Sequence, residues 1–345
     1  MTLQRAIEGP KTLMEREAGE AAAAVAAMLA ANRAAFAAIG ERLRAAPPAA
    51  VVTCARGSSD HAATYAKYLI ETMTGTPTAS AALSVASLYD APTLAGERLC
   101  LAISQSGQSP DLIAAVEQQK RAGAFVVALV NAEDAPLAAL ADVVVALKAS
   151  PEKSVAATKS YIASLAAIAA LVAAWAEDAA LGEALDGLPD ALPQAFALDW
   201  SAAIPALVGA TNLFVLARGY GYGVAQEAAL KFKETASLHA ESFSAAEVRH
   251  GPMAIVGDGF RVLALGGSDR AAESVREAAA EFRGRGATVL LADPAGGDLP
   301  ALAAHPAIEP MLMIQSFYRM ASDLALARGR NPDSPPHLNK ITETL

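Results

Sequence analysis

The sequence has little cysteine and a shortage of positive charge, and each shortage excludes a class of protein. Two cysteines in 345 residues are too few for a disulfide framework. Cys54 and Cys100 lie inside apolar, strand-like runs, where free buried thiols are usual. Lysine and arginine number 27 against 36 acidic residues, a formal net charge of -9. A nucleic-acid partner is therefore not expected, because such proteins usually carry a basic patch.

Targeting and membrane-spanning patterns are also missing. The opening Met1-Thr2-Leu3-Gln4 leads into mixed charges, whereas a secretory signal has a basic segment followed by an apolar one. The uncharged stretch from Tyr161 to Trp175 is shorter than the roughly 20 residues of a spanning helix, so we interpret it as a buried helix. These patterns predict a cytoplasmic protein with no membrane partner.

The sequence does contain an internal repeat, and it is long enough and apolar enough to form two domains. Hydrophobic residues make up 54% of the chain. The run from Val52 to Gly57 matches the run from Phe214 to Gly219 at an offset of about 162 residues, and the same shift places Leu101 to Ser104 on Leu263 to Gly266. The first two runs are strand-like and each ends in glycine. The repeat predicts two copies of one α/β unit.

Within the first copy, short apolar runs alternate with helical stretches, which favours a parallel sheet covered by helices on both faces. The expected strands are Val51 to Cys54, Leu99 to Ile103, Phe125 to Val130 and Val143 to Leu147. Ligands in such folds bind beyond the carboxyl ends of the strands. The predicted fold is therefore a doubly wound, flavodoxin-like α-β-α sandwich in tandem.

The segments between and around the two copies complete the expected organisation. An alanine-rich helical segment, Arg16 to Arg44, stops at Pro47-Pro48, and Leu188 to Pro193 is interpreted as a linker. The prolines after Gly329 predict an irregular tail. We expect an N-terminal helical segment at 1–45, a first domain at 46–190, a second at 200–328 and a tail at 329–345 that completes the site.

The turn Ser104-Gln105-Ser106-Gly107-Gln108-Ser109 follows one predicted strand and precedes a helix. Hydroxyls and backbone N–H groups at a helix N-terminus favour an anion, and phosphate is the obvious ligand. The alternative is a simple helix cap, which needs only one serine. The turn matches neither a Walker loop nor a dinucleotide fingerprint.

A second group of polar residues lies in the second copy. Ala225 to Thr235 is predicted as a helix, with Glu227, Lys231 and Glu234 on one face. The alternative is a solvated face with a salt bridge. A buried carboxylate can act as a base and a histidine can exchange protons near neutral pH.

Two neighbouring stretches, His239 to Phe243 and Glu247 to Pro252, are interpreted as a functional loop. The candidates for proton transfer are therefore Glu234 and His250. A metal site built from His239, Glu241 and His250 competes with this interpretation, but their spacing fits no zinc pattern, so no metal is expected.

These residues together resemble the sugar isomerase (SIS) family, in particular the isomerase half of the glucosamine-6-phosphate synthases. The matching stretches are Gly57-Ser58-Ser59, Ser104-Gln105-Ser106-Gly107, Val155-Ala156-Ala157-Thr158-Lys159, Glu227 to Glu234, His239-Ala240-Glu241, His250-Gly251-Pro252 and Asn339-Lys340. The resemblance covers nearly the full chain.

The resemblance implies a role for each matching residue. The residues implied to bind the sugar phosphate are Gly57, Ser58, Ser59, Ser104, Gln105, Ser106 and Ser109, with backbone contacts from Val155 and Ala156 and support from Glu227 and Lys231. It implies that Glu234 moves hydrogen between C1 and C2, that His250 assists ring opening, and that Lys340 sits at the reacting carbonyl. It further implies a homodimer with shared active sites and no cofactor.

The resemblance does not extend to one domain of the synthases. The synthases carry a glutaminase domain with a cysteine nucleophile, which we do not expect here, so ammonia rather than glutamine is the expected nitrogen partner. The expected reaction is deamination of glucosamine 6-phosphate to fructose 6-phosphate. Arg56, Gln108 and Ala157 stand where the synthases usually have cysteine, glutamate and serine. Galactosamine 6-phosphate, fructosamine 6-phosphate and a non-catalytic sugar phosphate sensor therefore stay open.

Overall fold

A computed structural model of the chain describes residues 11–340. The chain divides into two compact units, each described here by itself. The first unit comprises Ala23–Glu152 and Lys159–Asp186, and the second comprises residues 11–22, Lys153–Thr158 and Gly187–Lys340. Both units are discontinuous in sequence. The continuous domain boundaries expected from the sequence stay a prediction.

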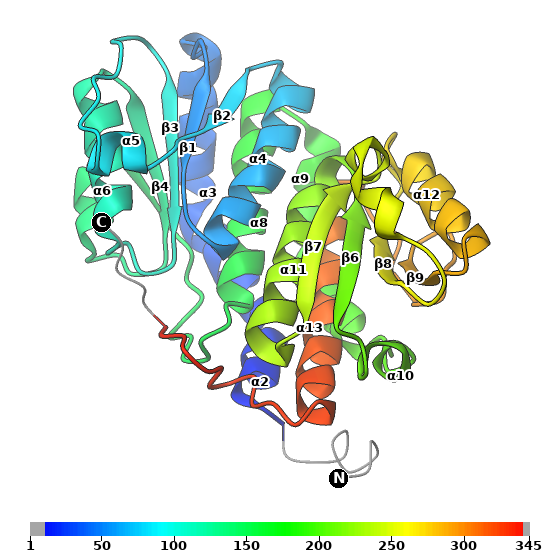
Figure 1. Cartoon of the computed structure of the whole chain (residues 1–345). Helices are drawn as coiled ribbons and strands as arrows, with labels where there is room; N and C mark the ends of the chain where they lie inside the picture. Colours follow the sequence, from blue (N-terminus) through cyan, green and yellow to red (C-terminus); the bar gives the residue numbers. More distant parts are fainter. Residues whose placement is uncertain (1–10, 341–345) are drawn as a thin grey trace. The chain divides into compact units, whose positions relative to one another are not determined.

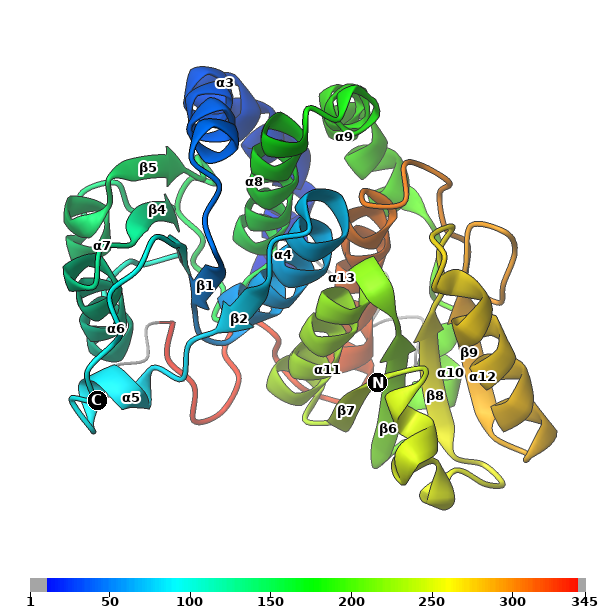
Figure 2. The ribbon, with the colours of Figure 1, turned by 90° about the horizontal axis from the view of Figure 1, so that it is seen from above.

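The first unit contains a five-stranded parallel sheet in the order β2-β1-β3-β4-β5, which is the flavodoxin-like order. The strands are β1 (Val51–Cys54), β2 (Thr78–Ser80), β3 (Leu99–Ser104), β4 (Phe125–Val130) and β5 (Val143–Ala146). The helices are α3 (Ala21–Ala45), α4 (Ser58–Thr74), α5 (Ser84–Ser87), α6 (Pro110–Arg121), α7 (Pro136–Leu140) and α8 (Lys159–Ala176). Figure 2 shows α6 and α7 on one face of the sheet and α4 and α8 on the other.

The second unit contains a four-stranded parallel sheet in the order β7-β6-β8-β9. Its strands are β6 (Asn212–Ala217), β7 (His239–Ser244), β8 (Arg261–Leu265) and β9 (Thr288–Ala292). Its α-helices are α2 (Leu13–Gly19), α10 (Ala203–Leu207), α11 (Tyr222–Ala236), α12 (Ala272–Gly284) and α13 (Glu309–Ala327), and its 3-10 turns are η1 (Gly219–Gly221), η2 (Glu247–His250) and η3 (Pro252–Ile255). Helices α11 and α13 cover one face of the sheet and α12 covers the other (Figure 1).

The two parallel sheets confirm the duplicated α/β fold. The sequence analysis missed β2, which has only three residues, and β7. His239 to Phe243 was expected in a loop, but the structure places it in β7, paired with β6 from Asn212↔His239 to Ala217↔Ser244. The interpretation as a loop is therefore wrong. Because β7 is an edge strand, its polar His239 and Glu241 stay exposed while Ala240 is buried, so hydrophobicity alone does not reveal it.

The linker expected at Leu188 to Pro193 lies beside the boundary between the units at Gly187, but it is not irregular, because these residues lie inside helix α9 (Ala179–Ala197). Leu181, Leu185, Leu188 and Leu192 are all buried at helical spacing. This periodic burial outweighs the backbone hydrogen bonds that Pro189 and Pro193 remove.

Two helices of the described chain, α3 and α8, are long and apolar enough to cross a membrane by length and composition alone. Most of α8 is buried, from Tyr161 at 2% exposure to Trp175 at 5%, which is the pattern of a core helix. The expectation of a buried helix is confirmed. Cys54 and Cys100 are free and buried, as expected. The hydrogen bond with Cys54, together with burial, raises the pKa of the Cys100 thiol, which keeps it protonated and unreactive.

Candidate functional site

The turn after β3 in the first unit is held in shape by its own serine hydroxyls. Ser104 Oγ accepts a hydrogen bond from Gly107 N at 2.9 Å, which closes the turn, and Gly107 has a φ of 64° that favours glycine. Ser109 is the N-cap of α6, yet its side chain makes no capping hydrogen bond. The simple cap considered from the sequence is therefore not what the structure forms.

A second turn lies at the same edge of this sheet. The register Cys54↔Ala102 places the residues after β1 beside those after β3. Gly57 begins α4 with a φ of 53°, and a Cβ built on it would meet no atom within 4 Å in the described chain. The space beside Gly57, at the N-terminus of α4, is therefore open in the described chain. Such an edge favours phosphate, because the N–H groups and helix dipoles attract negative charge.

Arg56 forms an ion pair at this edge. Its Nε and Nη2 donate to Asp111 Oδ2 at 2.9 and 2.6 Å. The Asp111 side chain is fully buried, whereas that of Arg56 is 54% exposed. The pair ties the turn after β1 to the first turn of α6. The sequence analysis singled out Arg56 but missed Asp111, because an acidic residue in the first turn of a helix is common.

The second unit holds the carboxylates and the lysine on helix α11. Lys231 Nζ lies 3.2 Å from Glu227 Oε1 and 2.6 Å from Glu234 Oε2. The three side chains are therefore in contact, as their spacing predicts. Glu227 and Lys231 are 0% and 1% exposed, so the alternative of a solvated salt-bridged face is wrong.

The charge state of Lys231 follows from these neighbours. Burial alone disfavours the ammonium, but the attraction of Glu227 and Glu234 outweighs it, so the net pKa of Lys231 is raised above its usual range. Glu234 is 20% exposed, which makes it the member of the cluster that a substrate can reach. Tyr318 of α13 lies 3.5 Å from Glu227; no sequence signal marks it within an apolar helix.

The remaining predicted residues of the second unit lie on irregular segments. His250 is exposed at the end of η2, just before Gly251 with a φ of 142°. Lys340 is half-buried in the irregular tail after α13, and the last part of that expected tail, residues 341–345, lies outside the described residues.

The segment before Val155 and Ala156 is fixed by a buried carboxylate. Glu17 accepts hydrogen bonds from Lys153 N at 2.6 Å and Ser154 N at 3.0 Å. Ala156 itself is fully buried, so the backbone contact with a ligand expected from the sequence is not exposed in this structure. Over residues 11–340, no group of three or more His, Cys, Asp and Glu side chains is arranged to hold a metal ion.

The predicted residues therefore fall into two sets, each within one unit. The first unit carries Gly57, Ser58, Ser59, Ser104, Gln105, Ser106 and Ser109. The second carries Val155, Ala156, Glu227, Lys231, Glu234, His250 and Lys340. The first set has the chemistry of anion binding, and the second has that of proton transfer.

Comparison with known proteins names the family. The model of the SIS domain family matches residues 47–174 and 206–305. The chain belongs to the SIS domain family. Among curated SIS relatives, the isomerizing glutamine–fructose-6-phosphate aminotransferase of Aeropyrum pernix is 34% identical over 307 residues, 82% of this chain and 49% of its own length. The chain spans about half the length of the curated relatives it matches.

Solved structures agree on the SIS fold. A protein of Silicibacter pomeroyi DSS-3, provisionally assigned as a phosphosugar isomerase, has a TM-score of 0.89 at 42% identity, covering 94% of this chain and 100% of its own. The glucosamine-6-phosphate deaminase of Thermotoga maritima has a TM-score of 0.73 at 22% identity, covering 93% of this chain and 100% of its own. The latter likeness shows the shared fold alone.

Proposed function

We propose that this SIS protein is a phosphosugar isomerase that deaminates an amino sugar 6-phosphate, with glucosamine 6-phosphate as the leading substrate. The observation that carries the proposal is the reachable Glu234 carboxylate held at 2.6 Å by the buried Lys231 ammonium. A fixed carboxylate beside an exposed surface is suited to removing a proton from carbon next to a carbonyl. Membership of the SIS family and the curated aminotransferase relatives support a sugar phosphate as the substrate class.

The proposed reaction balances without a redox or metal co-reactant. After ring opening, assisted by His250, Glu234 takes the proton from C2 of the open-chain amino aldehyde and returns it to C1. The C2–nitrogen bond thereby becomes an imine, and water hydrolyses it to fructose 6-phosphate and ammonia. General acid–base catalysis of this kind typically contributes about 100- to 10,000-fold to the rate.

The open edge of the first unit supports the assignment of the phosphate. Ser106 and Ser109 offer hydroxyls there, and the turn after Ser104 begins a helix of 12 residues. A phosphate dianion gains from both the N–H groups and the helix dipole. We assign binding to this edge and proton transfer to Glu234, with Lys340 at the reacting carbonyl. The homodimer and the cytoplasmic location stay predictions.

The test is ammonia release from purified protein given glucosamine 6-phosphate, galactosamine 6-phosphate or fructosamine 6-phosphate, beside the variant Glu234→Gln. Release from glucosamine 6-phosphate that the variant loses would support the proposal. Release from one of the other two sugars only would keep the deaminase or deglycase chemistry and change the substrate. Binding of all three without release would favour the non-catalytic sensor and overturn the enzyme.

A further inference from the structure

The turn after β8 in the second unit is the repeat of the turn after β3. The offset of about 162 residues places Ser106 on Ser268, Gly107 on Asp269 and Asn131 on Asp293. Like its counterpart, the second turn joins a buried strand to a helix, here the 13-residue α12. The repeat therefore retains the order of strand, turn and helix, but Asp269 does not share the positive φ of Gly107, and the side chains differ.

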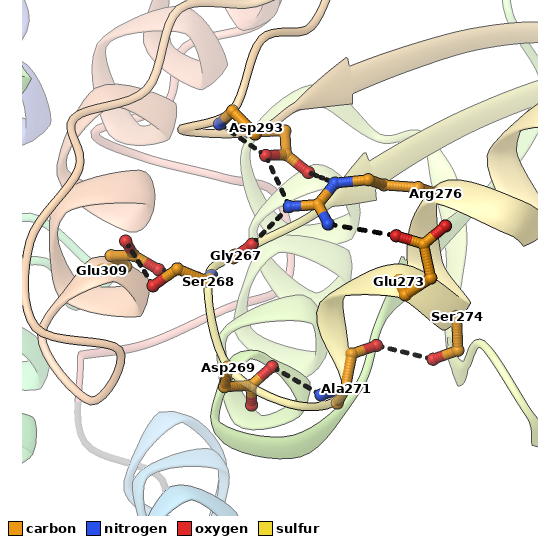
Figure 3. Close-up of polar contacts among 10 residues, drawn as sticks. Gly267, Ser268, Asp269, Ala271, Glu273, Ser274, Arg276, Asp293 and Glu309 are labelled. Atoms are coloured by element: carbon orange, nitrogen blue, oxygen red, sulfur yellow. Dashed lines mark hydrogen bonds and ion pairs between the residues drawn. The ribbon is translucent and has the colours of Figure 1, made fainter.

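The donors of this second turn already have an anionic partner, the side chain of Glu309 in the first turn of α13. Glu309 Oε2 accepts from Ser268 N at 2.8 Å and Oε1 from Ser268 Oγ at 2.9 Å, as Figure 3 shows. Oε1 also accepts from Ala304 N at 3.3 Å. Glu309 is 1% exposed. Its two oxygens thus take the backbone N–H and hydroxyl that a bound oxyanion would take.

The space above the neighbouring glycines is filled as well. Gly219 is the repeat of Gly57, and a Cβ built on it would lie 2.5 Å from Asp269 Oδ2. A Cβ on Gly266, the repeat of Ser104, would collide with the Asp293 carboxylate. The corresponding space above Gly57 in the first unit holds no atom of the described chain within 4 Å. The space beside Gly57 is therefore open, whereas the space beside its repeat, Gly219, is occupied by Asp269.

The two turns also differ in charge, because a neutral side chain beside the first turn is replaced by a carboxylate beside the second. Asn131 in the first unit is neutral, and its amide bonds to the backbone of Ala149 and Ser150. Its repeat, Asp293, is a buried carboxylate held by Arg276 through Nε at 2.9 Å and Nη2 at 3.2 Å. Arg276 Nη2 also donates to Gly267 O at 2.7 Å (Figure 3). The Arg276 guanidinium therefore bonds the buried Asp293 carboxylate and the backbone of the turn.

We propose that the turn after β8 is an anion site whose occupant is the Glu309 carboxylate of the chain itself. The internal carboxylate satisfies Ser268 and Ala304 and excludes phosphosugars from the second unit, so the chain binds sugar phosphate at one edge only. The assignment of sugar phosphate binding to the edge of the first unit rests on the proposed function. The occupation of the turn after β8 by Glu309 is independent of the proposed function.

The direct test removes the internal anion and supplies a small one. We expect Glu309→Ala to lower the melting temperature and added formate to raise it again by several degrees, because a ligand that binds only the folded state stabilises it. Formate should act better than inorganic phosphate, since it restores the single charge that was removed. Wild type should show no such rise.

Glu273→Ala is the matched control, because Glu273 is an exposed carboxylate of the same network that bonds Arg276 and not Ser268. Its melting temperature should respond to formate as wild type does. An equal response of Glu309→Ala, Glu273→Ala and wild type to formate would overturn the proposal.

Stoichiometry tests the same proposal with Glu309 in place, should Glu309→Ala fail to fold. Calorimetric titration of Glu234→Gln, which is expected to bind glucosamine 6-phosphate without turning it over, should show one site per chain, weakened at least tenfold by an added Ser106→Ala and unchanged by an added Ser268→Ala. Two sites per chain, or loss of the single site in Ser268→Ala, would overturn the internal occupation. No binding at all would refute the proposed function, while the formate response would still decide the role of Glu309.

Discussion

Replacing Lys231 with methionine tests the buried charge cluster at its centre. Methionine has a similar length but no charge, so Lys231→Met leaves Glu227 buried at 0% exposure without the ammonium 3.2 Å away. Removing one partner of a buried pair typically costs about 3–5 kcal/mol, because the other charge stays desolvated and uncompensated. At about 2–4 °C per kcal/mol for a domain of 150–250 residues, the melting temperature should fall by roughly 6–20 °C.

Urea denaturation monitored by circular dichroism measures the loss, with Lys233→Met as the matched control. Lys233 is exposed on the same helix, and substitutions at such positions usually change the free energy of unfolding by less than about 0.5 kcal/mol. The double variant Glu227→Gln/Lys231→Met should regain most of the stability, since neither remaining side chain is charged. Equal stabilities of Lys231→Met and Lys233→Met would refute the reasoning.

The stability contributed by Lys231 also depends on pH in a defined direction. Because the pKa of Lys231 is raised in the folded state, its contribution is fully present below the unfolded value of about 10.4 and is lost as pH rises through the higher folded value. Wild type should therefore lose this stability only in strong alkali. Lys231→Met should lack this alkaline loss of stability. The same alkaline loss in the variant and in wild type would contradict the role of the Lys231 charge.

Three further predictions test other parts of the structure. Burial, together with the nearby Glu15, raises the pKa of Asp323 from its ordinary 3.8 to about 6. Stability should therefore fall as pH rises between these values, and Asp323→Asn should raise the melting temperature at pH 7.5 but not at pH 4. Gly40 packs against the backbone of α8 where a Cβ would lie 2.6 Å from a carbonyl oxygen. Gly40→Ala should cost about 1–3 kcal/mol in urea denaturation, whereas Gly182→Ala, with open space in α9, should gain up to about 1 kcal/mol. In steady-state kinetics Ser106→Ala should raise KM with little change in kcat, and the opposite pattern would remove Ser106 from phosphate binding.

The sequence predicts those parts of the fold that local periodicity controls. Runs such as Leu99 to Ile103 are apolar at every position because both faces of the sheet are covered, so they are recognisable without tertiary information. Strand β7 is not, since its pairing with β6 at the sheet edge is a long-range interaction. The prolines of α9 mislead for a related reason: the burial of Leu188 and Leu192 that holds the helix together is tertiary.

In the candidate site, too, local spacing predicts some features and tertiary packing decides others. The contact of Glu227, Lys231 and Glu234 follows from helical spacing, and the structure confirms it. Their burial does not follow from spacing, because it depends on the packing of α11 against α13. The occupation of the second turn by Glu309 joins residues 41 positions apart, and a repeat seen in sequence alone gives no sign that one copy is filled.

Hydrogen exchange at the sugar tests the central claim, proton transfer by Glu234, most directly. Fructose 6-phosphate would be incubated with the protein in deuterium oxide, and loss of the C1 proton signal followed by NMR for wild type and Glu234→Gln, with calorimetry to confirm that both bind the sugar phosphate. The account predicts exchange by wild type and a loss of about 100-fold or more in the variant, in line with general base catalysis. Exchange by Glu234→Gln at the wild-type rate would contradict it.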